Sequence, residues 1–180
     1  SLHPLKNLNV AGDGGIVATN DDEIARKVRL LRNHGLVNRD IVEMPGFNHR
    51  LASLQAIIAY WQMTWEGEGG LDWVTERRIK IAAQYDAGLI DCPMVRIPPR
   101  NPRVKQVYHT YVIRAQRRDE LVRFLLERDI ETKVHYPVPI HLQPGYAFLG
   151  FHEGDFPETE QQAKEIISLP GHEYLSEDHI

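Results

Sequence analysis

Hydrophobic residues recur every three to four positions in five parts of the chain, which is the spacing of an amphipathic helix. The first helix is predicted to begin after Asn20 as N-cap, with Glu23 three positions later, and to end at Gly35, where a left-handed cap is favoured. The last helix is predicted over residues 159–169. The expected inward faces are Ile24, Val28 and Leu31; Leu54, Ile57, Ile58 and Trp61; Val74, Ile81, Tyr85 and Leu89; Leu121, Val122, Leu125 and Leu126; and Ala163, Ile166 and Ile167.

Three apolar stretches are typical of strands, and they cover residues 16–19, 108–115 and 132–136. A predicted helix that begins near Arg118 lies between the second and the third stretch. Strand, helix and strand in this order indicate a compact α/β or α+β unit, so we predict an α/β fold.

The clearest break in the helical pattern is the glycine-rich segment Trp65-Glu-Gly-Glu-Gly-Gly70. We expect a domain boundary there, between residues 1–66 and residues 67–180. In the helix that follows, Arg77, Arg78 and Lys80 interrupt or flank the apolar stripe. A charge cluster of this kind usually forms a solvated face, so these side chains are predicted to be exposed.

Composition and charge exclude several classes of function. The chain has 180 residues with 42% hydrophobic residues, enough for a core, and its net charge of -4 gives no basic excess for nucleic acid. Its apolar runs are far shorter than the ~18 residues of a membrane span. Cys92 is the single cysteine, which excludes an internal disulfide and favours a reducing compartment such as the cytoplasm.

The first fifteen residues carry the main candidate chemistry. Lys6 follows a turn stiffened by Pro4, and Gly12-Asp-Gly-Gly15 leads from it into the first apolar stretch. This setting, rigid on one side and sterically open on the other, suits an amine that must meet a planar ligand. Taken alone, the pattern also fits a solvated surface lysine.

Several motifs resemble one known family in the same order along nearly the whole chain. Ser1-Leu-His-Pro-Leu-Lys6-Asn-Leu with Gly-Asp-Gly-Gly looks like the lysine segment of the DegT/DnrJ/EryC1/StrS aminotransferases, which are pyridoxal-phosphate enzymes acting on nucleotide-linked keto-sugars. The later matches are Leu31-Arg-Asn-His-Gly35, Gly46-Phe-Asn48-His-Arg50-Leu51 with Leu54-Gln55-Ala56, Tyr108-His109-Thr-Tyr111, the stretch from His135 to Tyr146, and Ser168-Leu-Pro170.

The resemblance implies fold type I of the pyridoxal-phosphate enzymes, with the end of the large domain followed by the small C-terminal α/β domain. It implies that Lys6 binds pyridoxal 5'-phosphate covalently, that Ser1 contacts its phosphate and that His3 lies near the substrate. The family's asparagine at the position of Asn48 reaches the phosphate in the neighbouring subunit, which implies a homodimer with shared active sites. Local sequence alone supports a second role for Asn48, as the cap of the helix that follows it.

The stretch from His135 to His141 is the second candidate site. Two prolines, Pro137 and Pro139, fix an extended path, which suits a substrate wall that includes His135 and Tyr136. The spacing of His135 and His141 matches no common zinc arrangement and no third ligand is evident, so no metal is expected.

The implied function is transfer of an amino group from glutamate to a nucleotide-linked keto-sugar. Lys-Asn-Leu with Gly-Asp-Gly-Gly is more similar to the enzymes that act at C3 of the sugar than to those that act at C4. Family members are considerably longer, so we expect this chain to be a fragment that lacks a long N-terminal part, with the ring-stacking and pyridine-nitrogen partners, and a short C-terminal part.

Three other interpretations remain open. A related class removes the C3 hydroxyl and has histidine at the lysine position, and Lys6 argues against it. A non-catalytic regulatory or binding homologue would keep the same motifs. In the third, the chain is an α/β packing domain that shares only the fold.

Overall fold

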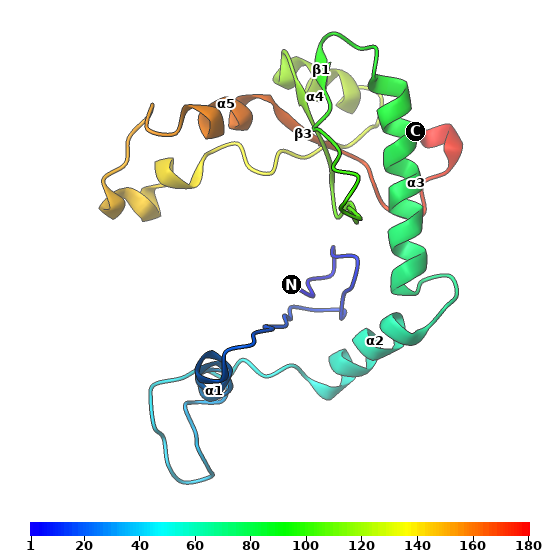
Figure 1. Ribbon diagram of the computed structural model, residues 1–180. Helices are drawn as coiled ribbons and strands as arrows, with labels where there is room; N and C mark the ends of the chain where they lie inside the picture. Colours follow the sequence, from blue (N-terminus) through cyan, green and yellow to red (C-terminus); the bar gives the residue numbers. More distant parts are fainter. The chain divides into compact units, whose positions relative to one another are not determined.

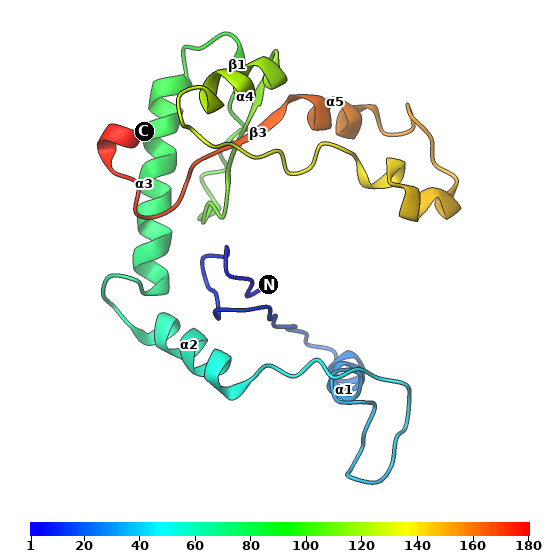
Figure 2. The same cartoon turned by 180° about the vertical axis from the view of Figure 1, so that it is seen from behind.

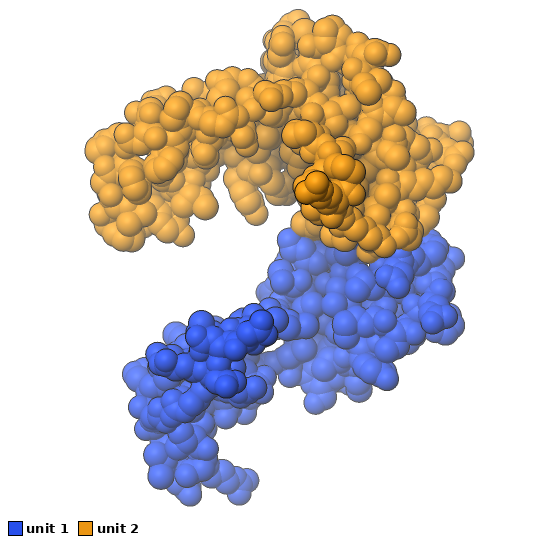
Figure 3. All heavy atoms as spheres, viewed as in Figure 1, with its two compact units in different colours: residues 1–74 blue, residues 75–180 orange.

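The computed structural model describes all 180 residues, and these form two compact units, residues 1–74 and residues 75–180 (Figure 3). Each unit is described by itself. The assignment of residues 1–66 and 67–180 to two enzyme domains stays a prediction. The helices are α1 (Asp22–Leu31), α2 (Ser53–Thr64), α3 (Leu71–Leu89), α4 (Arg118–Leu126) and α5 (Pro157–Glu165), and the strands are β1 (Val95–Arg96), β2 (Tyr111–Ala115) and β3 (Ile166–Leu169). Short 3₁₀ helices cover Ile140–Leu142, Pro144–Leu149 and Glu177–His179.

Helix α1 begins one residue later than the sequence pattern predicts. The N-cap is Asp21, not Asn20, because the Asp21 carboxylate accepts hydrogen bonds from the backbone N–H groups of Glu23 (2.8 Å) and Ile24 (3.0 Å). The helix buries Leu30, whereas Ile24 is 48% exposed, so the predicted inward face is only partly right.

Gly35 has the left-handed conformation expected of it, with φ +71°, and its N–H donates to the Leu30 carbonyl oxygen at 2.7 Å. It is not the predicted C-cap, because α1 ends at Leu31 and is capped by Arg32, whose φ is -70°. The position is also sterically closed to other residues, since a Cβ atom here would lie 1.6 Å from the carbonyl oxygen of Met44. The chain consequently folds back tightly behind α1.

Residues 16–19 form no strand, which corrects the sequence prediction. A strand needs hydrogen-bonding partners on a neighbouring strand, and no described residue pairs with this stretch. Ile16 and Val17 are 64% and 66% exposed. The apolar, β-branched composition is present, but the pairing is not.

Helix α2 buries a different face from the predicted one. Its buried residue is Ala59, which packs in a small core with Leu2 and Val10. The predicted inward residues Leu54, Ile57 and Trp61 are exposed instead. The face toward residues 1–15 carries Gln55 and Gln62, which bond to the backbone of Asp13 and Asn9.

The second unit is built on a three-stranded antiparallel sheet in the order β1-β2-β3 (Figure 1). Val95 pairs with Ala115, and β2 and β3 pair from Tyr111 with Leu169 to Arg114 with Ile166. The predicted helix over 159–169 is thus wrong in its second half, because Ile166–Leu169 pairs as a strand. The predicted strand at 132–136 is reduced to one bridge between Lys133 and Ser168.

The core of this unit joins α3 to the sheet. The described contacts place apolar side chains of α4 against it, while Leu126 is 62% exposed and not inward as predicted. Residues 137–156 extend away from the sheet beside α5 in both views (Figures 1 and 2). The buried core residues are Ile81, Ala82, Tyr85, Tyr111, Ile113, Ala115, Ile167 and Leu175.

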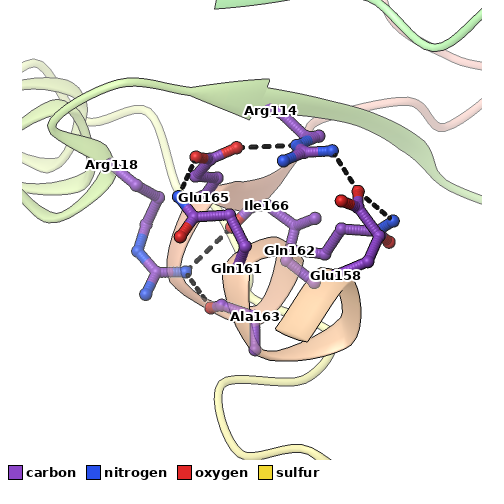
Figure 4. A network of polar contacts seen from close by, with 8 residues as sticks. All are labelled: Arg114, Arg118, Glu158, Gln161, Gln162, Ala163, Glu165 and Ile166. Carbon is purple, nitrogen blue, oxygen red and sulfur yellow. Dashed lines mark hydrogen bonds and ion pairs between the residues drawn. The ribbon is translucent and has the colours of Figure 1, made fainter. Parts of the chain in front are cut away.

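Arginine side chains tie these elements together. Arg114 of β2 donates to Glu165 at 2.6 Å and to Glu158 at 2.7 Å, both on α5 (Figure 4). Arg118 of α4 donates to the Ile166 carbonyl oxygen at 2.9 Å at the end of the same helix. Arg78 is buried, not solvated as predicted, because it pairs with Glu173 at 2.8 Å. Arginine can fill such sites because its stem packs while its planar head donates several hydrogen bonds.

Candidate active site

Residues 1–6 form a tight turn that presents Lys6. The His3 carbonyl oxygen accepts from the Lys6 N–H at 2.8 Å, and His3 Nδ1 accepts from the Leu5 N–H at 3.2 Å. Ser1 Oγ accepts from the His3 N–H at 3.3 Å. The structure therefore brings three predicted site residues, Ser1, His3 and Lys6, into one turn of the first unit.

The glycine-rich segment closes against this turn. The Leu2 N–H donates to the Gly14 carbonyl oxygen at 2.8 Å, and the Val10 N–H donates to the Leu2 carbonyl oxygen at 3.2 Å. A Cβ atom at Gly14 would lie 3.0 Å from Leu51 Cδ1 and 3.1 Å from Val10 Cγ2. Glycine is used here because the chain passes close to the small core beneath the lysine turn.

Two glutamines of α2 hold the chain that follows Lys6 at two points. Gln62 Nε2 donates to the Asn9 carbonyl oxygen at 3.0 Å, and its Oε1 accepts from the Asn9 N–H at 3.2 Å. Gln55 Nε2 donates to the Asp13 carbonyl oxygen at 3.1 Å. The two glutamines are two helical turns apart on one face, on either side of the buried Ala59. The periodicity of hydrophobic residues does not predict this role, because the two glutamines are polar and their partners are backbone groups.

Asn48 lies in a separate loop of the same unit and is held by Arg50. Its backbone bridges that of Asn33, and Arg50 Nε donates to Asn48 Oδ1 at 2.9 Å. The N-cap of α2 is Ala52, so the capping role considered for Asn48 is wrong. The amide group is exposed on the surface of the unit instead of satisfying a helix end.

Asn48 borders a groove of about 1190 Å³ in the first unit. Its walls are residues 13–19, one side of α1 and residues 47–51. Arg29, Arg32 and Arg50 line it, against a single carboxylate, Asp13. A surplus of guanidinium groups beside an amide suits the binding of an anion such as a phosphate.

His135 and Tyr136 belong to the second unit. His135 Nδ1 is 3.1 Å from Ser168 Oγ, and the Tyr136 side chain is 72% exposed. His141 Nε2 lies 3.0 Å from Glu160 Oε1, with both side chains almost buried. Burial raises the pKa of Glu160, but hydrogen bonds from the Gly154 N–H, His141 and the Phe156 N–H outweigh it and leave the pKa below its ordinary value. His141 therefore has a structural partner, while the roles of His135 and Tyr136 stay predictions.

No group of three or more His, Cys, Asp or Glu side chains is placed to hold a metal ion. No helix combines the length and the apolar character that crossing a membrane requires.

Known proteins match this chain along its whole length. The pattern of the DegT/DnrJ/EryC1/StrS aminotransferase family matches residues 1–180. A "Pleiotropic regulatory protein" of Geobacillus stearothermophilus is 43% identical over 99% of this chain and 47% of its own length. The dTDP-3-amino-3,4,6-trideoxy-alpha-D-glucose transaminase of Streptomyces venezuelae is 40% identical over 94% of this chain and 44% of its own length.

Solved structures confirm the expected fold. The crystal structure of S. venezuelae DesV in complex with a ketimine intermediate has a TM-score of 0.87 at 38% identity, covering 99% of this chain and 47% of that one. The chain thus spans about half the length of the relatives it matches. With a match over all 180 residues, a lysine turn closed by its glycines and the fold of a solved aminotransferase, the chain belongs to the DegT/DnrJ/EryC1/StrS aminotransferase family.

Proposed function

We propose that the protein is a pyridoxal-phosphate-dependent aminotransferase that moves an amino group from glutamate to a nucleotide-linked keto-sugar. The observation that carries the proposal is the closed lysine segment. Lys6 stands on a turn that is bonded to Gly14 and held by Gln55 and Gln62 of α2. An enzyme that repeatedly engages and releases one amine needs that amine on a fixed support.

The residues of the first unit fit this cofactor. The Ser1 hydroxyl accepts from a backbone N–H, which leaves its own O–H to donate to a phosphate. The Asn48 amide borders a groove lined by arginines and is exposed. We propose that Lys6 and Ser1 hold the cofactor of their own subunit and that Asn48 reaches the phosphate in a second copy, so that the active unit is a homodimer.

Bound pyridoxal phosphate supplies an electron sink for the carbanion left when a proton leaves the amino donor. The chain's own residues orient the substrate and transfer the proton. Lys6 Nζ accepts the proton from the donor's α-carbon and returns it on the other side of the exchanged nitrogen. His3, beside Lys6 in the same turn, lies on the substrate side, and His135 with Tyr136 forms a wall for the sugar nucleotide.

Reaction at C3 of the sugar is the preferred form of the proposal. The motif Lys6-Asn-Leu with Gly-Asp-Gly-Gly favours it, and the similar S. venezuelae protein is named as a 3-amino-sugar transaminase. Glutamate is proposed as donor from the family resemblance alone. The free thiol of Cys92 supports placement in the cytoplasm.

A regulatory homologue is the second candidate, because one similar protein carries a regulatory name. Turnover separates the two. In the intact protein, Lys6→Ala should abolish transamination, while Lys27→Ala, which removes a surface lysine paired with Glu23 at 2.7 Å, should leave it near wild type.

Both lysine variants should unfold within about 0.5 kcal/mol of the wild type, since neither truncation opens a core. Retention of more than a few per cent of turnover by Lys6→Ala would refute the catalytic assignment. An intact wild type that neither binds pyridoxal phosphate nor transaminates any keto-sugar would favour the regulatory homologue.

A further inference from the structure

The side chain of Arg50 forks between two asparagines. Its Nε donates to Asn48 Oδ1 at 2.9 Å, and its Nη1 donates to Asn33 Oδ1 at 3.3 Å. A guanidinium group has only donors, so the atom that faces it on each asparagine must be the carbonyl oxygen. This fixes the amide orientation of Asn48 by chemistry: Oδ1 is turned to Arg50 and Nδ2 is turned away.

Asn48 is exposed and lines the groove, and its Nδ2 group makes no hydrogen bond to the chain. Its backbone is held as well, because Asn33 and Asn48 bridge and the His49 N–H donates to the Arg32 carbonyl oxygen at 2.9 Å. The last bond of an asparagine side chain is broad and close to two-fold in energy, so the backbone alone does not choose between the two amide faces. Arg50 makes that choice.

We propose that Arg50 is a positioning residue for cofactor phosphate binding, which acts by keeping Asn48 in its donor orientation. The inference rests on the proposed function, in which Asn48 meets the phosphate in a second copy. Without Arg50, the amide would present Oδ1 to the phosphate for part of the time, and an oxygen dipole against a dianion is repulsive. The cost of losing Arg50 is therefore specific to ligands that carry the phosphate.

Ligands with and without the phosphate test this directly. The intact protein and its variants would be titrated with pyridoxal phosphate and with pyridoxal, which lacks the phosphate, and followed by absorbance. Arg50→Met keeps the apolar stem and removes the donors. It leaves the two amide faces of Asn48 about equally populated, so it should weaken pyridoxal phosphate binding about twofold and leave pyridoxal binding unchanged. The ratio of the two affinities does not depend on the folded fraction.

Arg26→Met is the matched control, since Arg26 lies outside the groove and pairs with Glu43. It removes the same charge from the same unit and should leave the affinity ratio unchanged. Arg50→Met should add little to Asn48→Ala in the double variant, because a residue that acts through another has no further effect once that other is gone.

Four outcomes would overturn the inference. Full additivity of Arg50→Met and Asn48→Ala would mean that Arg50 binds the phosphate itself. Equal losses for Arg26→Met and Arg50→Met would mean that only the net charge of the unit matters. A wild-type affinity ratio for Arg50→Met, with Asn48→Ala weakened, would remove the inference alone. A wild-type ratio for Asn48→Ala would remove the proposed phosphate contact and the inference with it.

Discussion

Asp86 of α3 lies where three polar side chains of the second unit meet. Arg100 donates to its carboxylate at 2.7 Å and 3.0 Å, and the Tyr111 hydroxyl donates at 2.7 Å. The Arg100 hydrogen bond holds the pKa of Asp86 below its usual range in spite of burial, and the Tyr111 bond adds to this. Burial and the neighbouring Asp86 raise the pKa of Tyr111. A single carboxylate thus links α3, the loop after β1 and the central strand.

This arrangement predicts acid sensitivity. A carboxylate whose folded-state pKa is depressed stabilises the fold above its unfolded pKa of about 3.9 and loses that contribution as pH falls through the lower, folded value. Asp86→Asn should reduce the free energy of unfolding by about 1–3 kcal/mol at neutral pH, since it replaces a charged acceptor by an amide. Denaturant unfolding at neutral and acid pH measures both effects, with the exposed Asp91→Asn as the control. An equal pH slope for wild type and Asp86→Asn would contradict the assignment.

Asn48 gives a second prediction at the scale of one residue. If its amide donates to a phosphate, Asn48→Asp is worse than Asn48→Ala, because it places a carboxylate against a dianion. We expect Asp to weaken pyridoxal phosphate binding at least about tenfold more than Ala in the intact protein. Melting temperatures serve as the control, since Asn48 caps no helix and neither change should cost much stability. Tight cofactor binding by Asn48→Asp would show that the contact is absent.

At the scale of elements, Gln55 and Gln62 of α2 fix the chain that follows Lys6. Gln62→Met preserves side-chain length but leaves the N–H and the carbonyl oxygen of Asn9 without their partner. We expect a loss of about 1–3 kcal/mol in the free energy of unfolding, with faster hydrogen exchange at the Asn9 amide. Met63→Gln makes the reverse change on the exposed neighbour, which is 53% exposed, and should stay within about 0.5 kcal/mol. If the two variants lose equal stability, the bridge is not what holds the segment.

The elements also show where sequence reasoning succeeds. The 3.6-residue period predicted the five helices, and the positive φ of Gly35 was predicted correctly although the C-cap of α1 is Arg32. The strand Ile166–Leu169 was missed because its apolar residues continue the helical period of α5, and only pairing with β2 distinguishes the two. The inner face of α2 was missed because the backbone polar groups of residues 9–13 need partners, and tertiary structure alone brings them there.

The candidate site divides in the same way. Lys6 and Asn48 were found because they occupy positions in motifs that resemble a family. The contact of Arg50 with Asn33 was not predicted, because the two residues are 17 positions apart and the turn that brings them together leaves no pattern in the sequence. Arg78 was predicted to be exposed because its partner, Glu173, lies 95 positions away in the sequence. Polar contacts between residues far apart in the sequence are therefore not predictable from residue spacing.

At the scale of the whole molecule, one face of α2 is apolar and exposed. Leu54, Ile57 and Trp61 are exposed by 77%, 62% and 47% and lie along one side of the helix. Exposed apolar faces of this kind promote association, so residues 1–180 expressed by themselves should self-associate. Ile57→Lys should shift the sedimentation distribution toward the monomer, and Ile90→Lys, at a single exposed position after α3, should not. Equal shifts would mean that charge alone prevents association.

The chain spans about half the length of its relatives, and this bears on cofactor binding. In the family, the ring-stacking side chain and the acidic partner of the pyridine nitrogen precede the lysine segment. Residues 1–180 by themselves should therefore bind pyridoxal phosphate weakly and turn over no substrate. Absorbance titration checks this. A stoichiometric band at low micromolar cofactor that borohydride fixes on Lys6 would show that these 180 residues suffice.

The double hydrogen bond between Gln62 and Asn9 has a consequence for how the molecule responds to acid. An amide side chain that pairs with both backbone groups of one residue acts as one rung of a sheet, and it carries no ionisable proton. The support of the lysine is thus neutral, whereas the second unit is tied by ion pairs such as Arg78 with Glu173 and Arg100 with Asp86. Acid should loosen the second unit while the lysine segment keeps its attachment to α2.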